Sequence, residues 1–191
     1  VDGTLVSQLQ SYLSQLLTNP GEREGCSDIC RAQIRLEALI GLADLGNLRQ
    51  DFLADLYEQR QQLDIVSQLK LARHLSRFDN WQAEADALAA QLQESVYETA
   101  RTATVNLPSG WGWFYSPVAA QAQALQLFVE RNGEPPLLWR LVQGLLDLRR
   151  QGTWQTPYDN AQALAALVSY SQLLPEPPNF QVTVDLGGQQ L

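Results

Sequence analysis

The fold of this chain is decided by one stretch, Gly152-Thr-Trp-Gln-Thr-Pro-Tyr-Asp-Asn-Ala-Gln-Ala-Leu-Ala-Ala-Leu-Val-Ser-Tyr170, in which a tight turn leads into a helix. Thr156 is a good N-cap, because its hydroxyl can accept a hydrogen bond from an unpaired backbone amide. Pro157 suits the first helical position, where a missing N–H costs nothing. The apolar residues that follow predict a helix buried between neighbours, so Leu164→Asp should unfold the protein by burying an unpaired charge. These residues are Ala161, Leu164, Ala165, Leu167 and Val168.

Helical periodicity dominates the rest of the chain as well. Apolar residues recur at three- and four-residue spacing, and proline, glycine or capping residues separate the segments. Asp79 or Asn80 is expected to cap the fifth helix, and Ser116-Pro117 repeats the cap-and-proline start of the last one. Short connections between the helices predict an all-α fold of antiparallel helical hairpins. The eight predicted helices cover about residues 5–18, 27–46, 48–57, 63–78, 79–103, 116–131, 135–152 and 156–174.

One segment departs from the helical pattern. Residues 104–107 and 113–115 flank a Pro- and Gly-containing turn at 108–112, which predicts a small β-hairpin or an aromatic loop. This loop is the best candidate for a contact with a domain or a ligand, because it gathers Trp111, Trp113, Phe114 and Tyr115. Its rings could plug one end of the helical domain, dock a neighbouring domain, or stack on a sugar or peptide.

Three other tryptophans, Trp81, Trp139 and Trp154, stand near predicted helix starts. Because a tryptophan in that position commonly fills the space between helices, we expect all three to be packing anchors.

The pattern Trp154-x-Thr-x-x-Asp-x-Ala-x-x-Leu-x-Ala-Leu167, preceded by Leu145-Leu-Asp-Leu-Arg-Arg-Gln-Gly152, resembles the bacterial α2-macroglobulin-like proteins. More narrowly, it is similar to the last helical hairpins of their thioester-bearing α/α-toroid domain, over about residues 105–175. The resemblance implies that residues 1–175 form a partial α/α toroid, an open arc rather than a closed ring.

The hydrophobic period changes near the C-terminus. After Pro175, apolar residues alternate with polar ones from Phe180 to Leu186, which is typical of a β-strand. We therefore expect residues 176–191 to form an extended exit strand, and the resemblance implies that it leads toward a following β-rich domain.

Composition excludes several classes of partner. The net charge of −8 argues against nucleic acid, because phosphate binding needs a basic surface. No apolar run approaches the ~20 residues that span a bilayer, so no direct membrane insertion is expected. The chain begins at Val1 and contains no methionine, which suggests a piece of a longer protein.

Cys26 and Cys30 are the only cysteines, and their spacing fits neither a zinc site nor a disulfide framework. If Cys26 precedes the helix and Cys30 lies in its first turn, a disulfide between them is possible; two buried free thiols are the alternative. The family's reactive group is an internal thioester in a Cys-x-Glu-Gln motif. Gln33 stands at the right distance after Cys30, but Ala32 occupies the Glu position, so we expect no thioester in this chain.

Catalytic and metal sites are also not expected. His74 is the only histidine, and it shares a predicted helix face with Lys70, Arg73 and Arg77. We interpret this face as a solvated basic surface rather than an anion site. Two groups of carboxylates lie opposite apolar residues and should face water: Asp51, Asp55 and Glu58, and Glu94 with Glu98. The sequence thus predicts no catalytic residue, no metal and no cofactor.

The resemblance implies a non-catalytic scaffold segment of a peptidase trap, which shields the thioester region. Its partners would be other domains of the parent protein and, through the parent, target peptidases. The parent would be extracellular or periplasmic. Two alternatives remain open: a carbohydrate-active or carbohydrate-binding α/α toroid that uses the aromatic loop, and a helical protein-interaction module.

Overall fold

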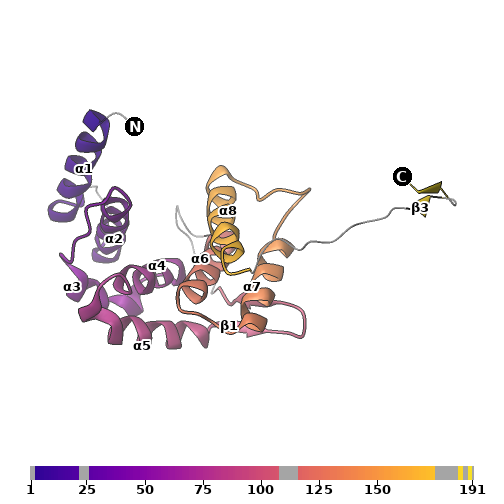
Figure 1. The fold of residues 1–191 in the computed structure, drawn as a ribbon. Coiled ribbons are helices and arrows are strands. Elements are labelled where there is room, and N and C mark those ends of the chain that lie inside the picture. The colour runs from indigo at the N-terminus through magenta and orange to yellow at the C-terminus, as the bar shows by residue number, and fades with distance from the viewer. Residues whose placement is uncertain (1–2, 22–25, 108–115, 175–184, 187–188, 191) are drawn as a thin grey trace.

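The computed structural model describes residues 3–21, 26–107, 116–174, 185–186 and 189–190 (Figure 1). Helices dominate these residues, as the sequence predicts, and the all-α class is confirmed. The helices are α1 Gly3–Thr18, α2 Asp28–Asp44, α3 Leu53–Glu58, α4 Ile65–Leu75, α5 Gln82–Gln93, α6 Pro117–Glu130, α7 Pro135–Asp147 and α8 Pro157–Ser171. Two 3-10 turns at Arg60–Gln62 and Asp79–Trp81 and four short strands complete the described elements: β1 Val96–Glu98, β2 Ala103–Val105, β3 Asp185–Leu186 and β4 Gln189–Gln190.

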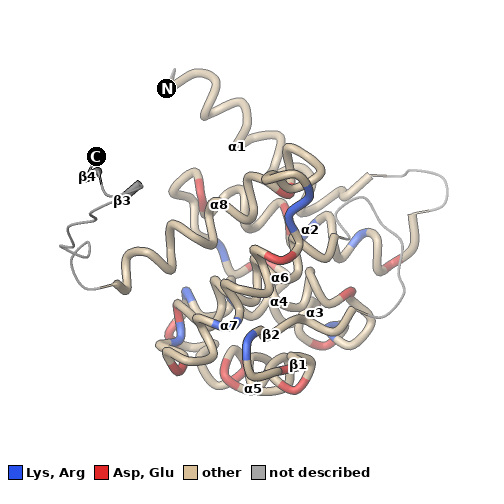
Figure 2. Tube along the Cα trace, turned by 90° about the vertical axis from the view of Figure 1, so that its right-hand side faces the viewer, with Lys and Arg blue, Asp and Glu red and all other residues tan. Residues whose placement is uncertain are grey.

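The helices form an arc of two layers (Figures 1 and 2). Helices α2, α4, α6 and α8 make up the inner layer, in which each contacts the next. Helix α1 packs on α2, α5 on α4, and α7 on α6. Hairpins stacked in this way form the open arc of a partial α/α toroid.

Several helix starts are formed by the capping residues that the sequence indicates. Ser116 accepts hydrogen bonds from the amides of Val118 and Ala119, and Pro117 occupies the first turn of α6. Thr156 accepts from the amide of Asp159 at the start of α8, at 3.0 Å. These hydroxyls satisfy amides that have no partner within the helix.

The prediction for the fifth helix is wrong at both ends. Neither Asp79 nor Asn80 caps it; a 3-10 turn comes first, and α5 begins at Gln82 without a capping side chain. The helix ends at Gln93, ten residues before the predicted end at 103. The chain then turns into a strand, because Val96 and its neighbours pair across a short turn.

The β-hairpin joins β1 to β2, with Val96 opposite Val105. The amide of Thr99 donates to the carbonyl of Thr102 at 2.8 Å, and the hydroxyl of Thr99 accepts from the amide of Thr102 at 2.9 Å. The prediction of a strand near 104–107 therefore holds in part, but its partner is 96–98. The predicted partner, 113–115, lies outside the described residues, as do the rings of Trp111, Trp113, Phe114 and Tyr115.

Helix α6 is the centre of the packing, and it is buried along nearly its whole length. Its Gln121 joins three elements: Nε2 donates to the carbonyls of Ala103 at 2.7 Å and Leu141 at 2.9 Å, and Oε1 accepts from the amide of Val105 at 3.0 Å. Because each buried amide group of Gln121 is paired, it connects β2 and α7 through α6 without leaving an unsatisfied polar atom.

Helix α8 turns a face of small residues inward, and of the apolar residues that predict its burial, Leu167 packs half-buried against the core while the others are exposed. Leu164 is 62% exposed, and Ala161, Ala165 and Val168 are exposed as well. The buried residues of α8 are Asp159, Ala163 and Ala166. Small side chains allow α8 to lie close to α6, and this close packing decides the buried face.

We therefore expect Leu164→Asp to be tolerated, contrary to the prediction from the sequence. A charge at an exposed helix position should change the free energy of unfolding by less than ~0.5 kcal/mol. Urea unfolding of the variant and the parent sequence measures this difference. A loss of several kcal/mol would mean that another surface covers this face of α8.

Two of the three tryptophans behave as packing anchors. Trp154 packs against the core and donates from Nε1 to the carbonyl of Leu145 at 3.0 Å. Trp81 contacts the ring of Tyr57 edge-on, with ring centroids 6.2 Å apart. The prediction for Trp139 is wrong, because its side chain on α7 is 54% exposed.

At the C-terminus, β3 pairs with β4 in an antiparallel ribbon. Residues 175–184, 187–188 and 191 lie outside the described residues, so the exit strand stays a prediction. No described helix is long and apolar enough to cross a membrane.

Candidate functional site

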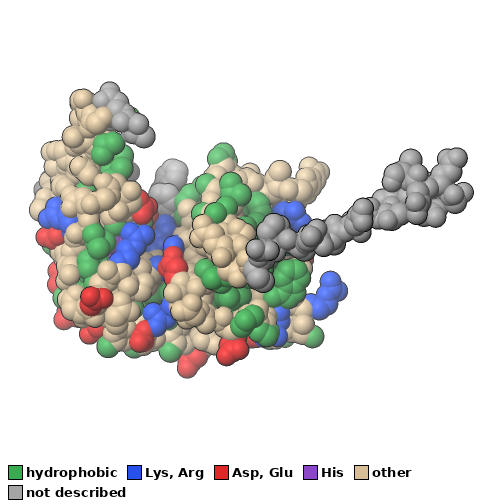
Figure 3. Space-filling model, viewed as in Figure 1, with side chains coloured by type: hydrophobic (Ala, Val, Ile, Leu, Met, Phe, Trp, Pro, Cys, Tyr) green, Lys and Arg blue, Asp and Glu red, His purple; other side chains and the backbone are tan. Residues whose placement is uncertain are grey.

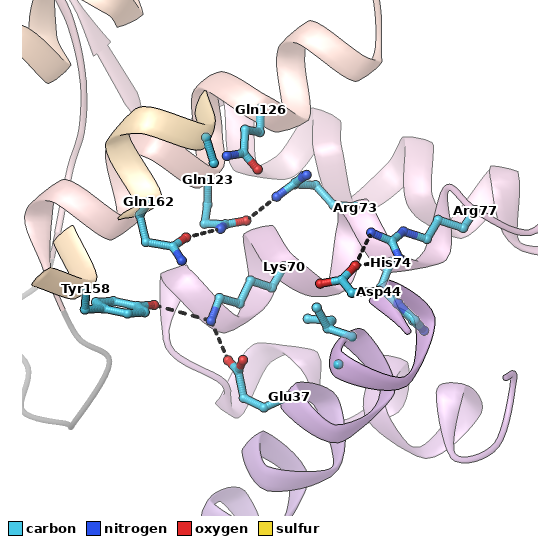
Figure 4. A pocket seen from close by; sticks show the side chains of 13 residues that line it. Glu37, Asp44, Lys70, Arg73, His74, Arg77, Gln123, Gln126, Tyr158 and Gln162 are labelled. Carbon is cyan, nitrogen blue, oxygen red and sulfur yellow. Dashed lines mark hydrogen bonds and ion pairs between the residues drawn. The ribbon is translucent and has the colours of Figure 1, made fainter. Parts of the chain in front are cut away.

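A groove of about 400 Å³ runs along the inner layer, and each of the four inner helices contributes side chains to it (Figure 4). The lining is mostly polar, and its residues are Glu37, Ile40, Gly41, Asp44, Lys70, Arg73, His74, Arg77, Gln123, Gln126, Tyr158, Gln162 and Ala165. Its volume falls in the range of small-molecule pockets, although those are usually more apolar. On the face seen in Figure 3, side chains of both charges are interspersed over the surface.

Ion pairs inside the groove correct the prediction of a solvated basic face. Lys70 and Arg73 on α4, and Arg77 in the turn that follows it, all line the groove inside the arc. Lys70, only 8% exposed, has its Nζ 2.5 Å from Oε1 of Glu37 on α2. Arg73 binds Glu130 on α6, and Arg77 lies 3.4 Å from Asp44 on α2. Each cation of this face therefore has a carboxylate on a neighbouring helix.

The pKa of Lys70 reflects two opposing causes. Burial disfavours the ammonium, but the charge and hydrogen bond of Glu37 outweigh burial, so the pKa is raised above 10.5. Burial also raises the pKa of the Tyr158 hydroxyl, which lies 3.4 Å from Nζ of Lys70. At neutral pH the groove thus holds a charged lysine beside a neutral tyrosine.

His74 is enclosed, with only 1% of its surface exposed, and its ring meets Phe78 edge-on at 5.5 Å. Neither ring nitrogen makes a hydrogen bond within the described residues, although the backbone of Arg49 lies near enough to favour protonation. Burial, and then the charge of Arg77, lower its pKa from 6.5 to about 4, against the weaker opposing effect of Asp44. The ring is neutral at pH 7.

The buried neutral state of His74 predicts a loss of stability in acid. In the unfolded chain His74 takes up its proton near pH 6.5, whereas in the folded protein it does so only near pH 4. The contribution of neutral His74 to the free energy of unfolding is therefore complete above pH 6.5 and is lost as the pH falls toward 4. From this group we expect the free energy of unfolding to fall by about 2 kcal/mol between pH 7 and pH 5. Urea unfolding across this range measures the fall, and His74→Leu should flatten it. An unchanged slope in that variant would assign the acid sensitivity to other groups.

Three glutamines form the wall of the groove on the side of α6 and α8. Oε1 of Gln123 accepts from Nη1 of Arg73 at 2.7 Å, and its Nε2 donates to Oε1 of Gln162 at 2.6 Å. A continuous polar chain thus crosses α4, α6 and α8 (Figure 4). Gln126, one turn further along α6, is only 5% exposed and lines the same wall.

A buried carboxylate that the sequence reasoning did not single out joins the starts of α6 and α8. Asp159, 6% exposed, accepts hydrogen bonds from the hydroxyls of Ser116 at 2.5 Å and Thr156 at 2.9 Å. Those two hydroxyls are the N-caps of the two helices. The signal was present in the Trp-x-Thr-x-x-Asp pattern, but its partner Ser116 is 43 residues away.

Cys26 and Cys30 form a disulfide in the structure, with Cα atoms 5.4 Å apart. The amide of Gln33 donates to Asp64, so this side chain is directed away from the cysteine pair.

The two sets of carboxylate side chains that the sequence predicts to face water do lie on the surface. Asp51, Asp55, Glu58, Glu94 and Glu98 are all exposed. Asp51 pairs with Arg49, whose hydrogen bond lowers the pKa of this carboxyl, and Glu98 pairs with Arg140. Among the described residues no group of three His, Cys, Asp or Glu side chains could hold a metal ion. The described groups of the groove can bind by hydrogen bonds and charge.

An open arc of α-helical hairpins defines the class of fold, and solved structures share it. The native conformation of Escherichia coli α2-macroglobulin matches over 91% of this chain and 11% of its own, with a TM-score of 0.63 and 18% identity. The crystal structure of the same protein from domain MG7 to the C-terminus matches over 92% of this chain and 27% of its own, with a TM-score of 0.62 and 18% identity. At this identity the likeness concerns the fold.

Sequence comparison identifies the family. An α2-macroglobulin homolog of Nostoc sp. is 53% identical over 192 aligned residues, which cover the whole of this chain and 10% of the relative. The chain belongs to the α2-macroglobulin family, as its resemblance at residues 105–175 implies. It spans about a tenth of the length of that relative. No family model matches the chain.

Proposed function

We propose that this chain is a non-catalytic scaffold segment of an α2-macroglobulin-like peptidase inhibitor, which shields the thioester region and packs on neighbouring domains. The observation that carries the proposal is the 53% identity over the whole chain. The ion pairs of the groove support a scaffold role, because they connect α2, α4 and α6 to one another.

The parent protein is extracellular or periplasmic in this proposal. The disulfide between Cys26 and Cys30 supports that location, because such bonds persist in oxidising compartments. The partners of the segment are the other domains of the parent, and target peptidases meet it through the parent.

The test uses the full-length parent protein and methylamine. An amine that attacks the thioester carbonyl displaces the cysteine thiol, so intact mass should rise by one methylamine while thiol titration detects one new thiol. Trypsin treated with the parent should also keep its activity on a small substrate and lose it on a large protein. No amine incorporation would refute the shielding of a thioester, and unimpaired cleavage of the large substrate would refute the trap.

A variant of this segment tests the shielding itself. Asp159→Ala loosens the starts of α6 and α8, so the thiol of the parent should appear faster on storage in water. Asp147→Asn, which changes an exposed carboxylate at the end of α7, is the matched control and should leave the rate unchanged. Equal rates in both variants would mean that this segment does not protect the thioester.

A further inference from the structure

We propose that a hollow between the β1–β2 turn and α7 binds one pyranose ring of a neutral oligosaccharide. The hollow has a volume of about 200 Å³, and residues 100–102 of the turn line it together with Trp139 and Gln143 of α7. The inference goes beyond the proposed scaffold function and does not rest on it. It rests on the fixed shape of the hollow and on the side chains that the protein leaves unused there.

Hydrogen bonds within the hairpin hold the turn side of the hollow. The amide of Thr99 donates to the carbonyl of Thr102 at 2.8 Å. Oγ1 of Thr99 accepts from the amides of Arg101 at 3.2 Å and Thr102 at 2.9 Å. These bonds join both ends of the turn, so its backbone presents one shape to the hollow.

The hairpin is also fixed against α7, beside the hollow (Figure 1). Arg140, the neighbour of Trp139 in the helix, forms an ion pair with Glu98 on β1. Gly144 in the same helix lets β2 approach closely, because a Cβ there would stand 2.3 Å from the carbonyl oxygen of Ala103. Since both sides of the hollow are held in place, a ligand loses little binding free energy to ordering the protein.

Trp139 presents an aromatic surface to solvent. Its side chain is 54% exposed, although tryptophan is highly buried on average in folded proteins. Within the part of the chain that the structure describes, its ring stacks on no other aromatic side chain, and its indole N–H makes no hydrogen bond. The face of this ring can pack on the apolar C–H face of a sugar, while the N–H can donate to a hydroxyl.

Polar side chains near Trp139 can supply the hydrogen bonds that a sugar needs. Gln143 stands four residues after Trp139, on the same face of α7, and Arg101 lines the hollow from the turn. Neither the amide of Gln143 nor the guanidinium of Arg101 has a hydrogen bond or an ion pair to another described residue. The amide offers donors and an acceptor, the guanidinium offers donors, and each sugar hydroxyl can both donate and accept.

This composition favours a sugar over a docked protein or a nucleic acid. A protein hot spot packs its tryptophan in a fully desolvated centre, ringed by contacts that exclude water. Here one large apolar side chain stands among polar ones, in a hollow smaller than the usual pocket of a drug-sized ligand. A pyranose ring has an apolar face and a rim of hydroxyls, and unlike a nucleotide it carries no phosphate for the net charge of −8 to repel.

The probe is cellotetraose, whose equatorial hydroxyls leave apolar C–H faces on each ring. In the 191-residue chain, millimolar cellotetraose should move the NMR signal of the Trp139 indole N–H, one of five such signals. Trp139→Ala should weaken binding about tenfold, and Gln143→Leu about fivefold, the effect of one hydrogen bond. Trp139→Phe keeps a smaller aromatic face, so it should lose less affinity than Trp139→Ala.

Tyr12→Ala is the matched control, because Tyr12 is 58% exposed and lies on α1, at the other end of the arc (Figure 1). This variant should bind cellotetraose as the parent sequence does. Equal binding by Trp139→Ala and the parent sequence, or no shift of the Trp139 signal, would overturn the proposal. Shifts confined to Trp111 and Trp113 would overturn it too, because the sugar would then bind elsewhere.

Tetraalanine, acetylated at one end and amidated at the other, is the competing probe. It offers peptide groups without charge and without a sugar ring, so it should leave the Trp139 signal in place. A shift with tetraalanine and none with cellotetraose would overturn the proposal in favour of a peptide contact.

Discussion

Asp159→Ala is expected to lower the free energy of unfolding by about 3 kcal/mol, because it removes the buried carboxylate that accepts hydrogen bonds from two capping hydroxyls. The hydroxyls of Ser116 and Thr156 each accept from helix amides and donate to this carboxylate. Without Asp159 both hydroxyls lose the partner that orients them, and the caps of α6 and α8 weaken together. Urea unfolding monitored by circular dichroism measures the loss.

Two further variants define the cause of this loss. Asp159→Asn keeps one oxygen acceptor but presents an NH₂ group to the second hydroxyl, so it should lose less than Asp159→Ala. Asp147→Asn removes an exposed carboxylate and should stay within ~0.5 kcal/mol of the parent sequence. If Asp159→Ala unfolds like this control, the two capping hydroxyls do not depend on the carboxylate.

Gly144→Ala is expected to lower the free energy of unfolding by a similar amount, about 3 kcal/mol, because the added methyl group overpacks the interior. A Cβ at this position would stand 2.3 Å from the carbonyl oxygen of Ala103 and 2.8 Å from Nε2 of Gln121. The backbone of β2 or α7 must therefore move, and the hydrogen bond between Gln121 and Ala103 must lengthen. The gain of roughly 1 kcal/mol that alanine brings to a helix interior is smaller than this cost.

Gly3→Ala is the matched control, because a Cβ there meets nothing within 4 Å in α1. Thermal unfolding should show a lower melting temperature for Gly144→Ala and an unchanged or slightly higher one for Gly3→Ala. Equal melting temperatures would mean that β2 can move away from α7 at little cost.

The sequence predicts best where the deciding interactions are local. The starts of α6 and α8 follow from a hydroxyl and a proline that are adjacent in the chain, at Ser116 and Thr156. The end of α5 cannot be predicted from local signals, because the strand at 96–98 is stabilised by pairing with 103–105. Helical periodicity alone predicts that the helix extends through these residues.

The surroundings of the groove residues could not be predicted from the sequence either, because their partners are far away in the chain. Periodicity places Lys70, Arg73 and Arg77 on one helix face, and in the structure all three line the groove, Arg77 from the turn after α4. Whether that face is solvated depends on Glu37, Asp44 and Glu130, which are 33 to 57 positions away. The buried face of α8 also depended on packing: Ala163 and Ala166 fit against α6, whereas Leu164 does not.

The chain of hydrogen bonds from Arg73 through Gln123 to Gln162 also bears on how the arc loses its structure. Because it joins α4, α6 and α8, opening any of these helices breaks bonds of the others, and their amides should exchange with solvent as one cooperative unit. Helix α1 has one buried residue, Leu17, and packs chiefly on α2. Its amides should exchange first, so that hydrogen exchange separates a labile end from a slowly opening middle.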